Sequence, residues 1–179
     1  AAKVGYGTEK SFVDVSMLRI GDNRKNFIPS DNPEYPVPAQ NLAVGLTSRI
    51  SLTSKLIFSV DGSVSFFTSN SSLDKSDTIN DRLLKLAGSL ISINPTSQRF
   101  TALKTSLSYN FSKNVSSGIE YRRIDPGYKS MGSYFFNNDM EQVTLNQSVS
   151  FLESKFRARG SIGMQRDNLD GSKNSTSKR

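Results

Sequence analysis

The chain has 179 residues, enough for one domain with a sizeable core, and it contains neither Cys nor His. Their absence excludes disulfides, thiolate and imidazole metal sites, and nucleophiles that a histidine activates. The net charge of +7 is compatible with an anionic partner, but the Lys and Arg residues are scattered and form no nucleic-acid-binding motif, so we expect no nucleic-acid partner.

A first strand is predicted over residues 12–20, where Val13, Val15 and Met17 alternate with other residues. The alternation changes phase at Leu18 and Ile20, which favours a β-bulge at that point. The next stretch, residues 21–41, carries four prolines, which the interior of a strand or helix would not accept. A long loop is expected there.

Three β-hairpins then follow, each with an apolar residue at nearly every second position. Their strands cover about 42–52 with 56–68, 99–111 with 115–125, and 141–151 with 156–166. Residues that pair across a hairpin share a face of the sheet, so the apolar sets must match across each turn. They do match if Leu52 faces Leu56, Phe111 faces Val115, and Phe151 faces Phe156.

These strands are about twice the usual length of a soluble strand, and short turns at one end alternate with long loops at the other. A tilted strand needs about 9–11 residues to cross a bilayer. The pattern predicts an all-β fold: an antiparallel up-and-down transmembrane β-barrel, or part of one, with about seven long strands. A soluble sheet with one face on a core explains the alternation equally well, but explains the strand length and the loop asymmetry poorly.

In such a barrel the apolar side chains face lipid and the intervening ones face the lumen. The residues predicted to face the lumen are Thr47, Arg49, Asp61, Ser63, Lys104, Glu120, Arg122, Asn146, Arg157 and Arg159. Phe111, Phe151 and Phe156 flank short turns, as an aromatic girdle would. For a soluble sheet, the polar set would consist of ordinary solvent-facing residues.

Two loop segments break the strand rhythm. Residues 80–91 fit one face of a short helix, which would fold into the barrel mouth, lie on the membrane interface, or simply cap the sheet. After the turn signal Asp125-Pro126-Gly127, a loop rich in aromatic residues is a candidate partner or ligand loop, or packs over the mouth; its residues are Tyr128, Tyr134, Phe135 and Phe136. Asp125, Asp139 and Glu141 lack EF-hand spacing, so we expect neither a metal nor a cofactor.

The stretch GIEYRRIDPGYKSMGSYFFNNDMEQVTLN, followed by GSIGMQRDNLDGSKNSTSKR, resembles segments of large outer-membrane β-barrel proteins of Bacteroidota-type bacteria. The signatures D-P-G-Y, Y-F-F-N-N-D and G-x-Q-R-D-N-L carry this resemblance, which extends over most of the chain from about residue 12. The resemblance implies an outer-membrane barrel and supplies no catalytic residues. It also implies a fragment of a larger barrel, because seven predicted strands is an odd number and bacterial single-chain barrels use even strand numbers.

The sequence therefore predicts a non-enzymatic β-barrel of the bacterial outer membrane, acting as a channel or as a structural subunit of an outer-membrane transport or assembly complex. Its expected partners are outer-membrane lipid and either other outer-membrane proteins or the rest of a larger barrel. The alternative is a secreted or surface β-sandwich that binds carbohydrate or protein through the aromatic loop at residues 128–136.

Overall fold

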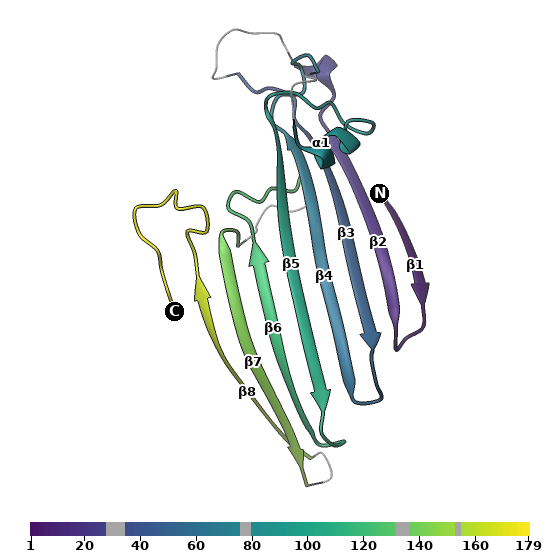
Figure 1. Ribbon diagram of the computed structural model, residues 1–179. Helices are drawn as coiled ribbons and strands as arrows, with labels where there is room; N and C mark the ends of the chain where they lie inside the picture. The colour runs from purple at the N-terminus through teal and green to yellow at the C-terminus, as the bar shows by residue number, and fades with distance from the viewer. Residues whose placement is uncertain (28–34, 76–79, 132–136, 153–154) are drawn as a thin grey trace.

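The computed structural model describes residues 1–27, 35–75, 80–131, 137–152 and 155–179. Eight antiparallel strands form one sheet in the order of the chain (Figure 1). They are β1 (Ala2–Gly7), β2 (Phe12–Gly21), β3 (Gln40–Ser51), β4 (Leu56–Thr68), β5 (Ser97–Asn110), β6 (Val115–Ile124), β7 (Met140–Phe151) and β8 (Phe156–Arg166). The predicted all-β, up-and-down architecture is confirmed. Because β1 and β8 form opposite edges, the sheet is open within the described residues.

The connections differ in length at the two ends of the sheet. At the turn end, residues 8–11, 52–55, 111–114 and 152–155 connect successive strands. At the loop end, residues 22–39, 69–96 and 125–139 make long crossings, which include a 3-10 helix η1 (Arg24–Asn26) and a short helix α1 (Arg82–Ala87). The predicted asymmetry between turns and loops is thus present. Within the described residues, no helix has the length and hydropathy needed to cross a membrane.

The hairpin registers follow from the apolar alternation. Ser51 pairs with Ile57 and Asn110 with Ser116, each one step before the predicted Leu52–Leu56 and Phe111–Val115 pairs. Phe151 pairs with Phe156, and their rings stack with centroids 5.7 Å apart. A shift of one residue would turn every apolar side chain to the other face, and the short turns oppose larger shifts, so the apolar pattern and the turn lengths together fix these registers.

Two features of the first strands differ from prediction. Strand β1 was not expected, because it has only six residues and two of them, Gly5 and Gly7, are glycines. The predicted bulge is wrong, since β2 pairs with β3 without interruption from Phe12 to Gly21. Leu18 and Ile20 instead lie on the opposite face of the sheet from Met17.

The helix predicted over residues 80–91 is shorter than expected. The side chain of Asp81 accepts hydrogen bonds from the amides of Leu83 and Leu84, which caps the start of α1. Gly88 ends it, and its amide donates to the carbonyls of Leu84 and Lys85. Residues beyond Gly88 continue across the sheet as irregular chain.

The buried core is small and lies at the loop end. There α1 and the chain after it pack against β3 and β4, in front of the sheet in Figure 1. The buried apolar residues of this cluster are Leu42, Phe66, Leu84, Ala87, Ile91 and Ile93. Elsewhere in the described residues the sheet is a single layer, so most of its apolar side chains have no covering element.

Candidate functional site

The register brings all ten residues predicted to face a lumen onto one face of the sheet. Thr47 lies opposite Asp61, Asp61 opposite Lys104, and Lys104 opposite Arg122. The same alternation places Arg49, Ser63, Glu120, Asn146, Arg157 and Arg159 on that side. We call this side the polar face. It consists of the odd-numbered residues of β1, β3, β4 and β8 and the even-numbered residues of β2, β5, β6 and β7.

Charges of both signs alternate across the middle of the polar face. Lys104 Nζ lies 3.2 Å from Glu120 Oε2, and Arg122 Nη2 lies 3.9 Å from Glu120 Oε1. Thr47 Oγ1 donates to Asp61 Oδ1 at 3.4 Å. These groups are partly exposed, so the ion pairs add little to stability. Their effect is to give this face a mixed and strongly hydrated surface.

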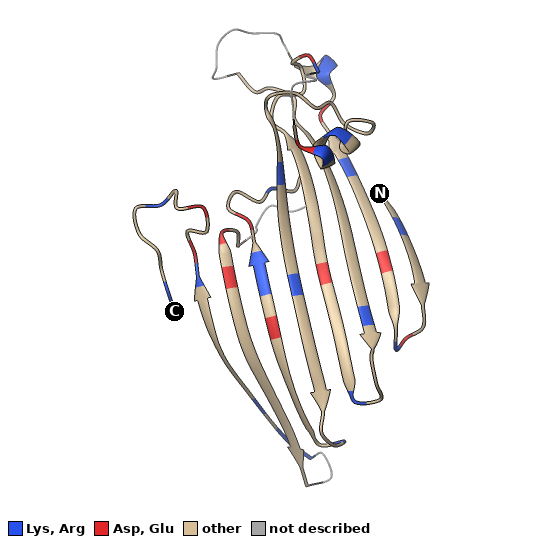
Figure 2. Cartoon of the chain, viewed as in Figure 1, with Lys and Arg blue, Asp and Glu red and all other residues tan. Residues whose placement is uncertain are grey.

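The turn end of the polar face is basic. Arg49, Arg157 and Arg159 form no ion pair with any described residue. Each short turn also carries one lysine, as the blue segments at the lower end of Figure 2 show; these are Lys10, Lys55, Lys113 and Lys155. The predicted hairpins already place Lys55, Lys113 and Lys155 at one end; the structure adds Lys10 from the turn between β1 and β2.

The polar face is concave. Side chains from β3 through β8 line one hollow of about 560 Å³, in which Ser59, Ser106 and Ser148 lie between Arg49 and Arg159. A hollow shared by six strands indicates that the sheet curves toward that side, whereas the hollow on the other side spans only β6 to β8 and residues 178–179. A second hollow of about 500 Å³ extends the same surface over β1 to β4. The large apolar side chains consequently lie on the convex side.

The loop after β6 folds onto the polar face at the loop end. The hydroxyls of Tyr128 and Ser63 lie 2.7 Å apart, and Ser65 Oγ donates to the carbonyl of Lys129. The amide of Met131 donates to Asn41 Oδ1 at 3.1 Å. Tyr128 is therefore buried, with 5% of its surface exposed, which agrees with the alternative that this loop packs over the mouth rather than with an exposed partner loop. Tyr134, Phe135 and Phe136 lie outside the described residues.

Sequence reasoning missed the residues that anchor this loop. Asn41 is fully buried, and its Nδ2 donates to Ser65 Oγ at 2.7 Å and to the carbonyl of Phe66 at 3.0 Å. A buried amide needs such partners. The only sequence signal was a polar residue at the start of a long apolar alternation, which does not identify a partner ninety residues away.

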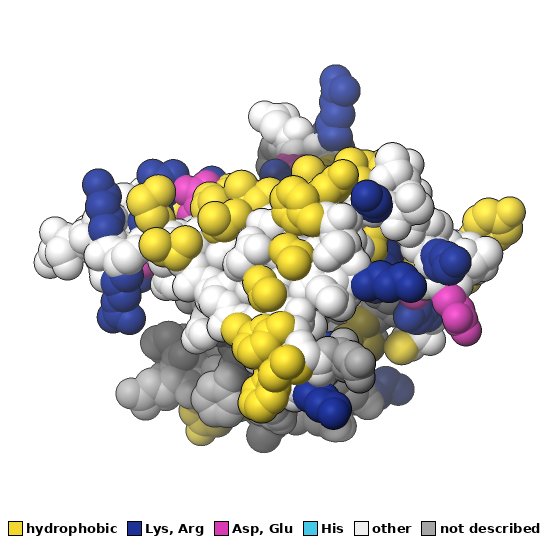
Figure 3. Space-filling model, turned by 90° about the horizontal axis from the view of Figure 1, so that it is seen from below, with side chains coloured by type: hydrophobic (Ala, Val, Ile, Leu, Met, Phe, Trp, Pro, Cys, Tyr) yellow, Lys and Arg dark blue, Asp and Glu magenta, His cyan; other side chains and the backbone are white. Residues whose placement is uncertain are grey.

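The opposite side, which we call the apolar face, remains largely uncovered. Every large hydrophobic side chain that is exposed within a described strand belongs to it. Seen from the turn end, hydrophobic side chains run along much of the upper side of the view (Figure 3). Exposed members include Val15, Leu46, Leu107, Ile119, Leu145 and Ile162. Soluble monomers rarely expose a continuous apolar surface of this extent.

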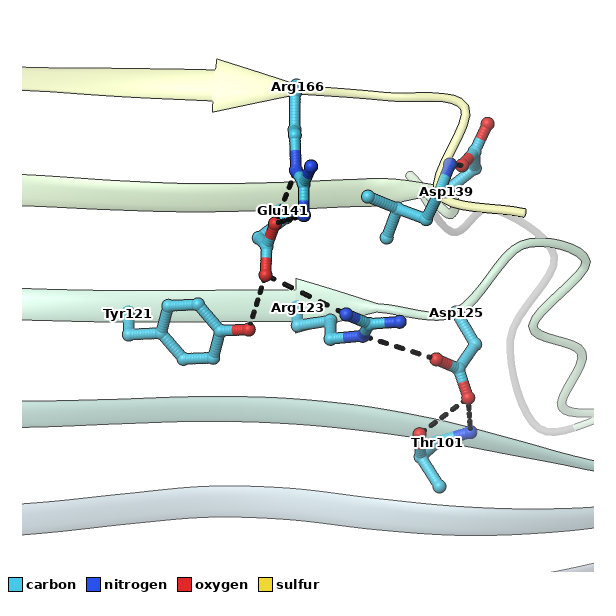
Figure 4. Close-up of polar contacts among 8 residues, drawn as sticks. Thr101, Tyr121, Arg123, Asp125, Asp139, Glu141 and Arg166 are labelled. Atoms are coloured by element: carbon cyan, nitrogen blue, oxygen red, sulfur yellow. Dashed lines mark hydrogen bonds and ion pairs between the residues drawn. The ribbon is translucent and has the colours of Figure 1, made fainter. Parts of the chain in front are cut away.

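A row of charged side chains borders the apolar face at the loop end. In the strand register, Arg123 lies opposite Glu141, Glu141 lies opposite Arg166, and Arg166 lies opposite Lys178. Tyr121 Oη donates to Glu141 Oε1 at 2.7 Å, and Arg123 Nη1 lies 3.7 Å from the same oxygen. Figure 4 shows both arginines directed at this carboxylate. We call Arg123, Glu141, Arg166 and Lys178 the boundary row; sequence reasoning did not identify it.

The nearby carboxylates are engaged by protein groups. Asp125 Oδ2 accepts from the amide of Thr101 at 2.8 Å, and Asp139 Oδ1 accepts from the amide of Leu169 at 2.8 Å. Asp139 also forms an ion pair with Lys173. Among the described residues, no cluster of three or more acidic, His or Cys side chains is arranged to hold a metal ion.

Comparison with known proteins gives no relative from which to assign these surfaces. No protein-family model matches the chain, and no curated protein or solved structure is significantly similar to it.

Proposed function

We propose that the chain forms part of the wall of a β-barrel in the bacterial outer membrane, with the apolar face against lipid and the polar face toward a passage. It acts as a channel or as a structural subunit of a transport or assembly complex, and it catalyses no reaction. Its partners are lipid and either other outer-membrane proteins or further strands of a larger barrel. The resemblance to large Bacteroidota-type barrel proteins agrees with this proposal.

The observation that carries the proposal is the polarity of the two curved faces. In a soluble sandwich or closed soluble barrel, the enclosed face holds the large apolar side chains and the outer face is polar. Here the concave face bears serines, amides and charges, while the convex face bears Leu, Val, Ile and Met. A transmembrane barrel requires this arrangement, because lipid surrounds its outer face.

Strand length and the ends of the apolar face support the same proposal. Strands β3, β4, β5 and β7 have 12, 13, 14 and 12 residues, which exceeds the 9–11 or so that a tilted strand needs to cross lipid. At the turn end, the rings of Tyr109 and Phe111 make an edge contact at 4.9 Å, and the Phe151–Phe156 stack lies at the same end of the sheet. Aromatic residues are enriched at membrane interfaces.

The β-sandwich alternative needs a second layer over the apolar face and an exposed aromatic loop. In the described residues, α1 and the chain after it cover only one end of that face, and Tyr128 is buried. No observation specifically favours the sandwich.

Single cysteines test the proposal directly, because the chain has no native Cys. We would compare Leu107→Cys with its neighbour Ser108→Cys, and Leu145→Cys with Asn146→Cys, in native outer membranes. A membrane-impermeant maleimide should label the polar positions in the membrane but the leucine positions only after the protein is unfolded, because the reactive thiolate is disfavoured in lipid. If the leucine positions react with this reagent in the membrane as fast as the polar positions, and the protein stays soluble without detergent, the proposal is wrong.

A further inference from the structure

We propose that the corner of the apolar face over β6, β7 and β8 binds the phosphate group of a membrane lipid, lipid A of the outer leaflet, toward which the long loops of an outer-membrane barrel point. This inference rests on the proposed function, since it needs the apolar face to lie in a bilayer. It adds a specific site, a ligand chemistry and the residues that recognise it.

A hollow with an apolar floor lies directly beneath the boundary row. Its volume is about 610 Å³, and its lining includes Tyr121, Val143, Met164, Arg166 and Lys178. Val143 pairs with Met164, and in the next apolar pair toward the turn end Leu145 faces Ile162. The floor therefore continues into the exposed apolar face without interruption, as an acyl chain requires.

Cations predominate in the boundary row. Three of its four residues are cationic, and Arg123 and Arg166 keep 42% and 56% of their side-chain surfaces exposed. Glu141, the one carboxylate of the row, already accepts from Tyr121 and Arg166. Asp125, behind the row, lies 3.7 Å from Arg123 and accepts from Thr101. The carboxylates thus position the guanidinium groups, while Lys178 lies opposite Arg166 with no ion pair to a described residue.

The arrangement of an apolar floor under a cationic rim fits an anionic amphiphile. Guanidinium and ammonium groups bind phosphate oxygens through charge-assisted hydrogen bonds, and the planar guanidinium offers a paired donor geometry. A soluble anion would make no contact with the apolar floor, and a neutral lipid would gain nothing from the cations. Lipid A uses both, because its phosphate groups carry a net negative charge, whereas the choline of phosphatidylcholine neutralises the phosphate of that lipid.

Further cations extend this chemistry along the same border. Arg19 and Arg99 lie on the apolar face near the loop ends of β2 and β5, and Arg82 and Lys85 belong to α1, which packs on that face. Arg99 is paired with Asp81 at 2.8 Å. Around α1, Leu83 and Leu86 are 45% and 72% exposed, as expected for a helix resting in a membrane interface.

The test is photo-crosslinking from Ile162, which lies on the floor side of the site and outside the cationic row. The full protein carrying p-benzoylphenylalanine at this position would be reconstituted in phosphatidylcholine bilayers containing a small fraction of ³²P-labelled lipid A. The double variant Arg166→Gln/Lys178→Gln should lower the lipid A crosslink by about fivefold for each cation removed. The charge-preserving variant Arg166→Lys/Lys178→Arg should retain most of it.

A matched control is Arg157→Gln/Arg159→Gln, which removes two cations of β8 from the polar face and should leave the crosslink unchanged. Crosslinking to labelled phosphatidylcholine separates the two proposals. If phosphatidylcholine crosslinks but lipid A incorporation is the same in the Arg166/Lys178 double variant, the phosphate site is wrong and the membrane orientation stands. If neither lipid crosslinks, the apolar face does not contact lipid and both proposals fail.

Discussion

Placing a charge in the middle of the apolar face separates a membrane surface from a water-exposed one. Leu145 is suited to this, because its row, Ile119–Leu145–Ile162, lies between the boundary row and the aromatic turn end. Asn146, the next residue of β7, points to the polar face and provides a matched control. We expect Leu145→Arg to destabilise the folded protein strongly in a bilayer and Asn146→Arg to have little effect.

The depth of Leu145 sets the size of the effect. It lies four residues from Glu141 along β7, which corresponds to about 13 Å along the strand. With the usual barrel tilt this is roughly 10 Å below the boundary row, near the middle of an apolar band about 25 Å high. Arginine at that depth costs about 2–4 kcal/mol, equivalent to a loss of roughly 30-fold to 1000-fold in the folding equilibrium constant. In water, a half-exposed leucine at this site would change stability by only about 0.5 kcal/mol.

The assay is urea unfolding of the wild-type protein and each variant in phospholipid vesicles. Met164→Arg serves as a depth control, because it lies one row below Arg166 on the same strand and should cost only about 0–1 kcal/mol. The reasoning is refuted if Leu145→Arg and Asn146→Arg differ by less than about 0.5 kcal/mol, or if the arginine at position 164 is as costly as that at position 145.

Three further predictions concern the pairing of β7 with β8 and the two loop segments. A Cβ on Gly163 would lie 2.6 Å from the carbonyl oxygen of Val143, whereas one on Gly160 meets nothing within 4 Å; Gly163→Ala should therefore cost about 1–3 kcal/mol in the same unfolding assay, and Gly160→Ala should be nearly neutral. Tyr128→Phe removes the hydroxyl contact with Ser63 and should weaken the packing of residues 125–131 on the polar face by about 0.5–1.5 kcal/mol. The measurement is hydrogen exchange of the Met131 amide, which should become faster. Exchange as slow as in the wild-type protein would contradict this, and Tyr109→Phe on the other face is the control. The hydrogen bond from Arg99 holds the pKa of Asp81 below its usual 3.8. The Asp81 carboxylate therefore stabilises the start of α1 fully at neutral pH and loses this effect as the pH falls below 3.8. The amide signals of Leu83 and Leu84 should titrate with a midpoint under that value in the wild-type protein but not in Asp81→Asn.

The apolar alternation was sufficient to predict most of the sheet. Side chains repeat every two residues along a strand, so strands of 10–14 residues carry enough alternating pairs to fix both their extent and their register. Strand β1 was not predicted because its six residues include only two large apolar side chains, Val4 and Tyr6. The apparent bulge arose because Leu18 and Ile20 lie on the polar face near its loop end, where apolar residues also occur.

The contacts of the loop segments were not predictable in the same way. The helical period of residues 80–91 does not identify the face of the sheet on which they pack, and residues 125–131 have no regular period. Their positions depend on single buried contacts, such as Asn41 with Met131 and Leu84 with the cluster around Phe66. The boundary row depends similarly on neighbours in three strands, with Glu141 between Arg123 and Arg166. Such groups become visible only when the register is known.

The direction of curvature is the property that the alternating pattern cannot contain. The alternation of apolar and polar residues along a strand is the same whether the sheet curves toward its apolar or its polar side. A soluble sheet and a barrel wall therefore share one sequence pattern. In this sheet, both loop segments cover the loop end, α1 on the apolar face and residues 125–131 on the polar face. The hollow of the polar face is left uncovered toward the turn end, where Arg49 and Arg159 line it without an ion pair to any described residue. In the proposed barrel, the polar face would therefore be open at the basic turn end and covered by residues 125–131 at the loop end.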